Sequence, residues 1–168
     1  MLLVQFAKSL DSKKLKPGDV VTARVFIDQV IGSELRIPKG SLVLGHVTQA
    51  ASRSSGAAQS TMNMVFDRIE IHKGGTLSIS TVVLALVPDP IPASTTPLGI
   101  EYADRSEEIY KPNVSMPMGV STPLLNEQSR GVYGIKDLQL DPHGMFFSDK
   151  NEIKIDAGAR MLLDVTLR

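Results

Sequence analysis

Apolar and polar residues alternate with a period of two along much of the chain from Met1 to Val87. Between residues 21 and 27, apolar side chains occupy every odd position and alternate with polar ones such as Thr22 and Arg24. Residues 161–167 repeat this alternation most clearly. Successive side chains of a β-strand point to opposite faces, so this period predicts strands with one buried face.

Turn residues interrupt the alternation about every ten positions, which is typical of an all-β fold. We predict strands near residues 2–8, 20–28, 42–50, 60–72, 76–87, 138–148 and 160–167. Mainly antiparallel strands with short connections form either a barrel or a sandwich. The pattern leaves both architectures open.

Four segments carry the residues that specific turns require. Lys16–Asp19 predicts a type II turn, because Pro17 sets the first central φ and glycine accepts the positive φ that follows. Ile37–Gly40 and Asp141–Gly144 predict type I turns, with proline second and glycine fourth. Lys73–Thr76, with two central glycines, predicts a two-residue hairpin loop.

Two predicted strands depart from simple alternation. In residues 60–72 the apolar positions change parity, which predicts a β-bulge near Phe66–Asp67 or, alternatively, a strand buried on both faces. In residues 76–87 the second half is apolar on both faces. We expect that half to be covered on both sides.

Residues 88–130 differ from their surroundings. Seven of the ten prolines lie there, mixed with Ser, Thr and a charged patch at 101–108. Proline removes hydrogen-bond donors from a strand ladder, and the segment has no clear period. We therefore predict a single β domain, residues 1–168, with 88–130 as a Pro/Ser-rich inserted loop or arm that carries one short helix near 105–110. Gly131 and Gly134 after it are expected to let the returning chain pack closely on the sheet.

Composition excludes several classes of function. Eighteen basic and eighteen acidic residues give zero net charge, which argues against a nucleic-acid partner. The absence of cysteine excludes thiol catalysis, Cys-ligated metal sites and disulfides. No apolar run approaches the ~20 residues of a membrane-spanning helix, so we expect no membrane-spanning segment.

Catalytic motifs are absent from the sequence. His46, Asp67 and His72 fall on consecutive predicted strands and are weak candidates for metal ligands, because no HExxH or HxH spacing is present. Without a GxSxG elbow, Ser54–Gly56 indicates a solvated connection rather than a nucleophile. We therefore expect no catalytic residue and no cofactor.

Binding residues are expected among the few aromatic and methionine side chains outside regular strands. Tyr102, Tyr110 and Tyr133 are the only candidates for a flat aromatic platform. Met116 and Met118 form a pair within the predicted loop, where no core is evident for them to fill. Long irregular loops are disproportionately functional, which favours a binding role for this segment.

A resemblance adds to this interpretation. It is carried by Leu10–Asp19, Ile37–Val47, Phe66–Ile69 and the stretch from Ser129 to Leu163. Together these look like a group of uncharacterised exported β-proteins of environmental bacteria. More distantly, the order Pro-Gly-Asp, strand, Ile-Pro-Lys-Gly, strand, Phe-Asp-Arg-Ile is similar to the C-terminal β-barrel domain of TrbI-type scaffold proteins of conjugative type IV secretion systems.

The resemblance implies an envelope-associated β domain. TrbI-type proteins assemble as rings, and their barrel carries an apolar helical hairpin where this chain has the polar segment 88–130. A secretion channel is therefore not what the resemblance implies here. We expect a periplasmic or secreted location, although Met1–Val4 leads directly into a predicted strand, so that the given chain is expected to lack a signal peptide.

The expected function is a non-enzymatic structural or interaction module of the cell envelope or exterior. It would meet a protein partner, or another copy of itself, through loop 88–130 or an exposed edge strand. The alternative is a small-ligand or carbohydrate-binding module that uses the barrel mouth and Tyr102, Tyr110 or Tyr133. A metal-dependent hydrolase is the third possibility.

Overall fold

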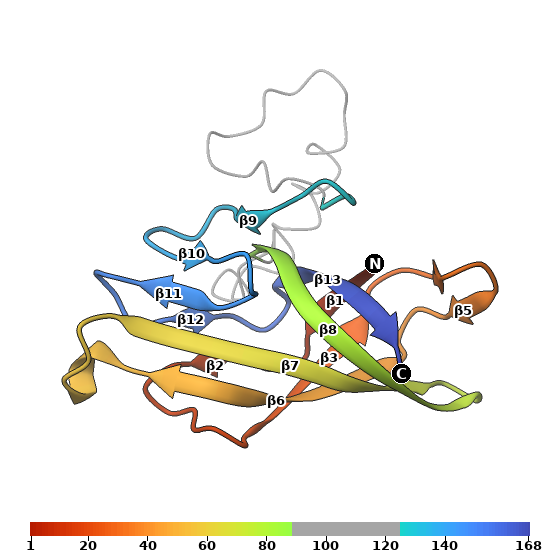
Figure 1. Ribbon diagram of the computed structural model, residues 1–168, viewed down its shortest axis with the longest axis horizontal. Coiled ribbons are helices and arrows are strands. Elements are labelled where there is room, and N and C mark those ends of the chain that lie inside the picture. Colours follow the sequence, from red (N-terminus) through yellow and green to blue (C-terminus); the bar gives the residue numbers. More distant parts are fainter. Residues whose placement is uncertain (89–124) are drawn as a thin grey trace, which may run out of the picture.

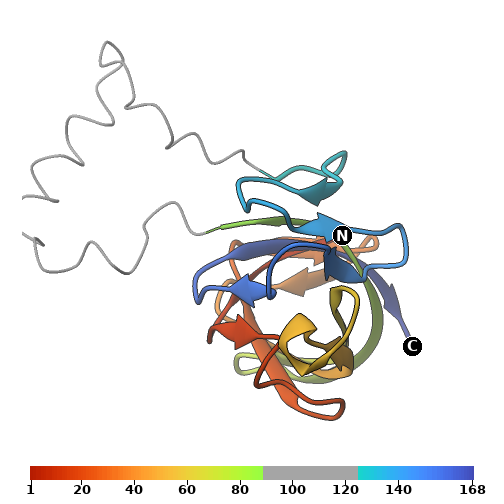
Figure 2. The ribbon, with the colours of Figure 1, turned by 90° about the vertical axis from the view of Figure 1, so that its left-hand side faces the viewer.

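Six long strands form the centre of the molecule: β1 (Leu2–Phe6), β3 (Val20–Val25), β6 (Leu42–Ala51), β7 (Ser60–Ile71), β8 (Gly75–Val87) and β13 (Arg160–Leu167). The computed structural model describes residues 1–88 and 125–168. Neighbours follow the order β7–β6–β3–β1–β13–β8, and β8 pairs with β7 to close the ring (Figures 1 and 2). The all-β prediction is confirmed, and the architecture is a closed antiparallel barrel rather than a sandwich.

Shorter elements surround the barrel. They are β2 (Leu10–Asp11), β4 (Gln29–Ile31), β5 (Leu35–Ile37), the 3-10 turn η1 (Arg53–Ser55), β9 (Gly131–Val132), β10 (Gln139–Leu140), β11 (Phe146–Ser148) and β12 (Lys154–Ile155). β2 pairs with β12, and β4 pairs with β5. The strand predicted at 138–148 is divided into β10 and β11, because a turn lies between them.

The alternation read from the sequence places one face of each barrel strand inside. In β1, Leu2, Val4 and Phe6 are buried, whereas Leu3 and Gln5 are partly exposed. Side chains fill the barrel interior, and the largest that are fully buried include Phe66, Phe146, Leu2, Ile37, Met62, Ile69, Ile79, Ile153, Met161 and Leu163. A binding site is therefore to be sought on the outside of the barrel.

Two of the four turn predictions are confirmed. In Lys16–Asp19 the Asp19 N–H donates to the Lys16 carbonyl (3.0 Å), and Gly18 has φ +95°, as in a type II turn. In Asp141–Gly144 the Gly144 N–H donates to the Asp141 carbonyl (3.1 Å).

The other two turns are displaced by one or two residues. The predicted Ile37–Gly40 turn lies at Pro38–Ser41, because Ile37 stays in β5 with its side chain in the core. The predicted loop at Lys73–Thr76 is centred instead on His72 and Lys73, because the ladder continues to the pair Ile71–Gly75.

The predicted β-bulge in β7 is confirmed. Leu44 pairs with Arg68 and Gly45 pairs with Phe66, so Asp67 is the extra residue. Buried positions change from even to odd numbers across it. A one-residue insertion turns every later side chain to the opposite face, and the bulge thus keeps both halves of β7 facing the core.

Beyond this bulge β7 and β8 separate. Regular pairing between them covers only Arg68–Ser78 to Ile71–Gly75. Thr81 then bridges the gap: its Oγ1 accepts from the Phe66 N–H (2.9 Å) and donates to the Phe66 carbonyl (3.0 Å). A side chain here takes the place of a missing rung of the ladder.

The segment from β9 to β11 enters the opening between β7 and β8 (Figure 1). β11 pairs with the first residues of β7, and β9 pairs with β8 in parallel at Ala85 and Leu86. The prediction that glycine allows close packing of the returning chain holds at Gly134, where a Cβ would lie 3.2 Å from Pro88 Cγ. It does not hold at Gly131, which pairs with Ala85 but has open space where a Cβ would lie. The resulting sheet has nine strands and ends at β10 and β9.

The apolar second half of β8 is covered only in part. Ala85, Leu86 and Val87 are buried, as predicted, but Val82 is 41% exposed and Leu84 is partly exposed. The outer face of β8 is therefore accessible at Val82 and Leu84, next to the residues of β8 that pair with β9.

Much of the predicted inserted segment falls outside the described residues, including the helix expected at 105–110. Its described parts, Pro88 and residues 125–130, adjoin β8 and β9. Among residues 1–88 and 125–168 there is no helix with the length and apolar character to cross a membrane.

Candidate functional site

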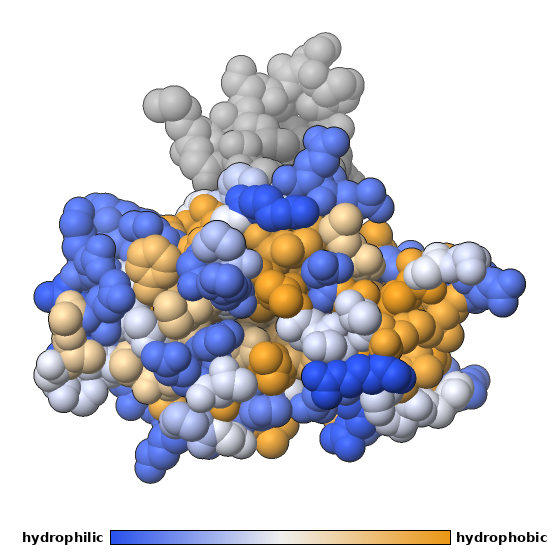
Figure 3. All heavy atoms as spheres, viewed as in Figure 1, coloured by the Kyte–Doolittle hydropathy of each residue, from blue (hydrophilic) through white to orange (hydrophobic). Residues whose placement is uncertain are grey.

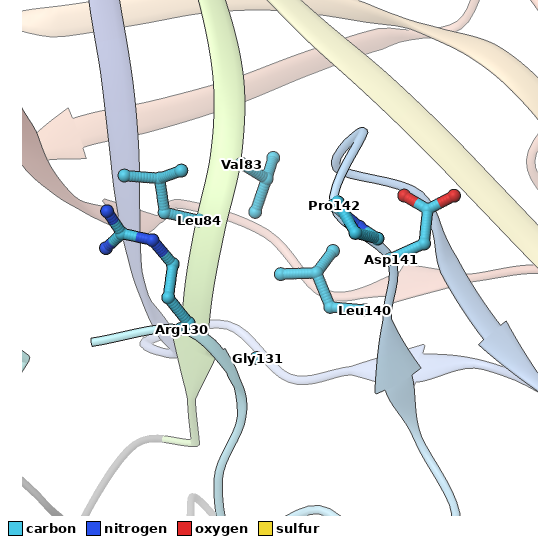
Figure 4. A pocket seen from close by; sticks show the side chains of 7 residues that line it. All are labelled: Val83, Leu84, Arg130, Gly131, Leu140, Asp141 and Pro142. Carbon is cyan, nitrogen blue, oxygen red and sulfur yellow. The ribbon is translucent and has the colours of Figure 1, made fainter. Parts of the chain in front are cut away.

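The opening between β7 and β8 is not completely filled. A hollow of about 290 Å³ remains between β8 and the returning segment (Figure 4). Its lining residues are Val83, Leu84, Arg130, Gly131, Leu140, Asp141 and Pro142. The volume lies near the lower end of the range for small-ligand sites, which suits a single side chain or a short segment better than a large ligand.

The apolar wall of the hollow depends on a second bulge. Leu162 pairs with Ala85 and Leu163 pairs with Val83, so Leu84 is the extra residue in β8. Bulges redirect side chains, and Leu84 lies at the hollow opposite Leu140 and Pro142 (Figure 4). Figure 3 shows apolar atoms at the surface over this part of β8, with hydrophilic residues on either side.

Arg130 provides the positive charge at this site. Its Nη1 donates to the carbonyls of Glu127 (2.9 Å) and Ser129 (2.7 Å), and its backbone N–H donates to the Tyr133 hydroxyl (3.2 Å). These bonds fix the side chain beside Leu84 (Figure 4). Within the described residues, Nε and Nη2 make no hydrogen bond and the guanidinium makes no salt bridge.

Asp141 lies on the opposite side of the hollow, and its carboxylate points away from Arg130 (Figure 4). Its Oδ1 already accepts from the N–H groups of His143 (2.8 Å) and Met145 (2.9 Å). Asp141 therefore holds the turn after β10, while Arg130 keeps donors that no described residue uses. The hollow combines an apolar wall with a cation at its edge.

A second polar cluster, around Glu152, closes the end of the barrel that bears η1. Its Oε2 accepts from the hydroxyls of Ser12 (2.9 Å) and Ser60 (3.1 Å), and Oε1 accepts from the Ser54 N–H (2.8 Å). Burial opposes ionisation of this carboxyl, but hydrogen bonds from Ser52, Ser54, Ser12 and Ser60 outweigh it and lower the pKa of Glu152 to about 2.

This cluster has a structural role. Its hydrogen bonds join Ser12, Ser54 and Ser60, which lie in three separate segments of the chain, to one carboxylate. The sequence prediction of a solvated connection at Ser54–Gly56 agrees with the structure, in which these residues are exposed, and the Ser54 N–H in η1 also anchors the connection to Glu152.

Of the three metal candidates, the structure brings two together. The Oδ2 atom of Asp67, the bulged residue of β7, lies 3.0 Å from His46 Nδ1, and both side chains are about half exposed. His72 lies in the turn after β7 and is not part of this pair. Among the described residues no group of three or more His, Asp or Glu side chains converges as metal ligands would.

Of the other predicted binding residues, Tyr133 lies in the part of the chain that the structure describes. Tyr102, Tyr110, Met116 and Met118 lie outside the described residues. Tyr133 follows β9 and is joined to Arg130 through its hydroxyl, but it does not line the hollow.

Sequence reasoning missed the residues that form the hollow, above all Leu84 and Arg130. The one usable signal was the loss of alternation in residues 82–87, which marks a strand whose outer face is apolar. The Glu152 cluster carried no signal, because its serines are spread from position 12 to position 60.

Comparison of the chain with protein-family models, with curated proteins and with solved structures finds no significant match.

Proposed function

We propose that the protein is a non-enzymatic interaction module, of the cell envelope or secreted, that binds a partner polypeptide at the open side of its barrel. The observation that carries this proposal is the hollow between β8 and the β9–β11 segment, which combines the accessible Leu84 with Arg130, two of whose donors no described residue uses. An accessible apolar wall beside a charged group is the usual composition of a protein-binding contact.

The geometry favours this hollow over addition of a partner strand between the two ends of the sheet. β9 and β10 approach within 8 Å between Cα atoms without pairing with each other. A strand inserted between two others needs about 9–10 Å, twice the normal spacing. A partner side chain in the hollow fits the site, whereas a complete strand between β9 and β10 does not.

The test uses two arrays of the same random peptides, one attached through the N-terminus and the other through the C-terminus. We expect the full chain to bind a subset of peptides on at least one array. Leu84→Glu should abolish this binding, because it places a charge in the apolar wall of the hollow.

The matched control is Val20→Glu, since Val20 is 72% exposed on β3 and does not line the hollow. Both variants should melt within a few degrees of the wild type, as surface changes usually do. Absence of any binding on both arrays, or equal binding by Leu84→Glu, would refute the proposal.

A small-ligand module remains the second candidate, and the same hollow is its site. A sugar is the less suitable ligand, because none of the described residues that line the hollow is aromatic and sugars commonly stack on aromatic faces. A saturable rise in melting temperature with a sugar or lipid panel, absent in Leu84→Glu, would favour this candidate.

The envelope or exterior is proposed as the location on the strength of the resemblance to exported β-proteins. Fractionation of the native host, with the protein detected by antibody, tests it. Recovery in the cytosolic fraction would contradict this part of the proposal.

A further inference from the structure

Arg130 and Leu84 define the chemistry that the hollow can recognise. The guanidinium lies beside the Leu84 side chain, as Figure 4 shows, so that a ligand that packs against Leu84 also reaches the cation. Two donors of the guanidinium, Nε and Nη2, are unused among the described residues. Arginine binds carboxylates with two parallel hydrogen bonds, which requires two donors on one side of the fork.

The shape of the site limits how a chain can enter. The hollow is bounded on one side by β8 and on another by the turn Asp141–Gly144, and residues 130–131 cross beside it. Its volume of about 290 Å³ accommodates one or two side chains. The part of a ligand that occupies the hollow is therefore limited to about the size of one or two side chains.

We infer that the hollow captures the C-terminal end of a partner polypeptide, with the terminal carboxylate on Arg130 and an apolar last side chain against Leu84, Leu140 and Pro142. This inference rests on the proposed function and names the partner's chemistry at the same site. A C-terminal residue places a carboxylate and an apolar side chain on one Cα, which matches the adjacency of Arg130 and Leu84.

The neighbouring acidic group does not oppose this assignment. The Asp141 carboxylate points away from Arg130, and its Oδ1 already accepts two backbone N–H groups. Among the described residues, the hydrogen-bond partners of Arg130 with titratable side chains are Glu127, which contributes its backbone carbonyl, and Tyr133, whose hydroxyl accepts from the Arg130 N–H. Among the described residues that line the hollow, the charge beside Leu84 is therefore that of the guanidinium.

The peptide arrays already separate this inference from the proposed function. Peptides attached through the N-terminus keep a free C-terminal carboxylate, and those attached through the C-terminus do not. We expect binding on the first array only, with apolar residues enriched at the last position. Binding that is equal on both arrays would leave an interaction module standing and would overturn capture of a chain end.

Soluble peptides then measure how much the free C-terminal carboxylate contributes to the affinity. Acetylated hexapeptides selected from the first array, measured by fluorescence polarisation, should bind with roughly tenfold or greater loss of affinity when the C-terminus is amidated, since a charge-assisted hydrogen-bonded pair is removed. Free acetate and octanoate serve as competitors. If octanoate displaces the peptide at equal concentration, the site recognises small amphipathic carboxylates and the polypeptide assignment fails.

Arg130→Gln tests the cation, and Arg130→Lys tests its geometry. Arg130→Gln should bind acid and amide peptides equally and weakly, while Arg130→Lys should keep a preference for the acid with reduced affinity. Arg53→Gln is the control, because Arg53 is an exposed arginine of η1 at the far end of the barrel. A preference for the acid that persists in Arg130→Gln would overturn the inference.

Discussion

Thr81 and Gly45 show at the scale of single residues how the barrel tolerates a bulge. The Thr81 hydroxyl satisfies both backbone groups of Phe66, which is fully buried and would otherwise lose its partners where β7 and β8 separate. Gly45 faces the other edge of β7, where a Cβ would lie 2.7 Å from Phe66 Cα and would also contact the Val65 carbonyl. The bulge thus depends on one hydroxyl and on one missing side chain.

Replacement of Thr81 by valine tests this arrangement. Thr81→Val keeps the shape of the side chain but leaves the Phe66 N–H and carbonyl unpaired in a buried place, and we expect a loss of about 1–3 kcal/mol in the free energy of unfolding. Urea denaturation followed by circular dichroism measures it. Thr76→Val on the exposed part of β8 is the control and should change stability little, so equal effects of the two substitutions would contradict the role of the Thr81 hydroxyl.

At the scale of elements, Glu152 joins parts of the chain that no ladder connects. Its carboxylate accepts hydrogen bonds from Ser12, which follows β2, from Ser54 in η1 and from Ser60 at the start of β7. Ser12 also accepts from the Ile153 N–H at 3.0 Å. The cluster fixes the barrel end over the core, where β2 and β12 form their own small sheet.

The lowered pKa of Glu152 makes this contribution dependent on pH. Its usual pKa of 4.5 falls to about 2 in the folded protein, so its stabilising effect is complete above pH 4.5 and is lost as the pH falls toward 2. Glu152→Gln should lower the free energy of unfolding at pH 7 by about 1–2 kcal/mol, since hydrogen bonds to a charged acceptor are replaced by weaker ones. Denaturation across pH 7 to pH 2 measures it.

The difference between wild type and Glu152→Gln should shrink as the pH falls below 4.5, because the carboxyl then takes up a proton in both the unfolded and, finally, the folded state. Glu34→Gln, at an exposed turn, is the control and should follow the wild type. A difference that stayed constant down to pH 2 would show that the substitution acts by shape and not by charge.

At the scale of the whole molecule, all six strands of the closed barrel lie within residues 1–87 and 160–167. The β9–β11 segment fills the one side at which β7 and β8 diverge, and it returns to the barrel immediately after residues 125–130. Within residues 1–88 and 125–168, the buried side chains of the barrel strands already form a continuous hydrophobic core.

This organisation predicts that residues 92–126 can be deleted without loss of the fold. Residues 88–91 and 127–130 would still connect β8 to β9, and we expect a folded protein with a cooperative thermal transition. Binding on the peptide arrays should persist if the hollow is the site, whereas its loss in a folded variant would assign binding to the predicted inserted loop. An unfolded product, by circular dichroism, would contradict the prediction that the segment is an insertion.

Much of the fold could be predicted from the sequence because its determinants are local. Period-two alternation identified the long strands, and a change of parity located the Asp67 bulge to within a residue. Turns were placed well where proline and glycine alone set the conformation, as at Pro17–Gly18. They were misplaced where the core decided, as at Ile37, whose burial extends β5 and moves the turn.

The candidate site could not be predicted in the same way. His46 and Asp67 do meet, as neighbours on adjacent strands can, but His72 does not join them. The hollow combines residues 83–84 with residues 130–142, whose proximity follows from the parallel pairing of β9 with β8. No periodicity within either segment encodes that pairing.

The sequence by itself determined that this chain is all-β, which residues of each strand face the core and where one bulge lies, because these depend on side-chain alternation along a single strand. Only the tertiary structure decided that the strands close into a barrel, that Glu152 gathers serines distant in sequence, and that β7 and β8 part to leave a hollow beside Arg130. Those features arise from contacts between segments that are distant in sequence, and such contacts stabilise the fold only after the segments have come together.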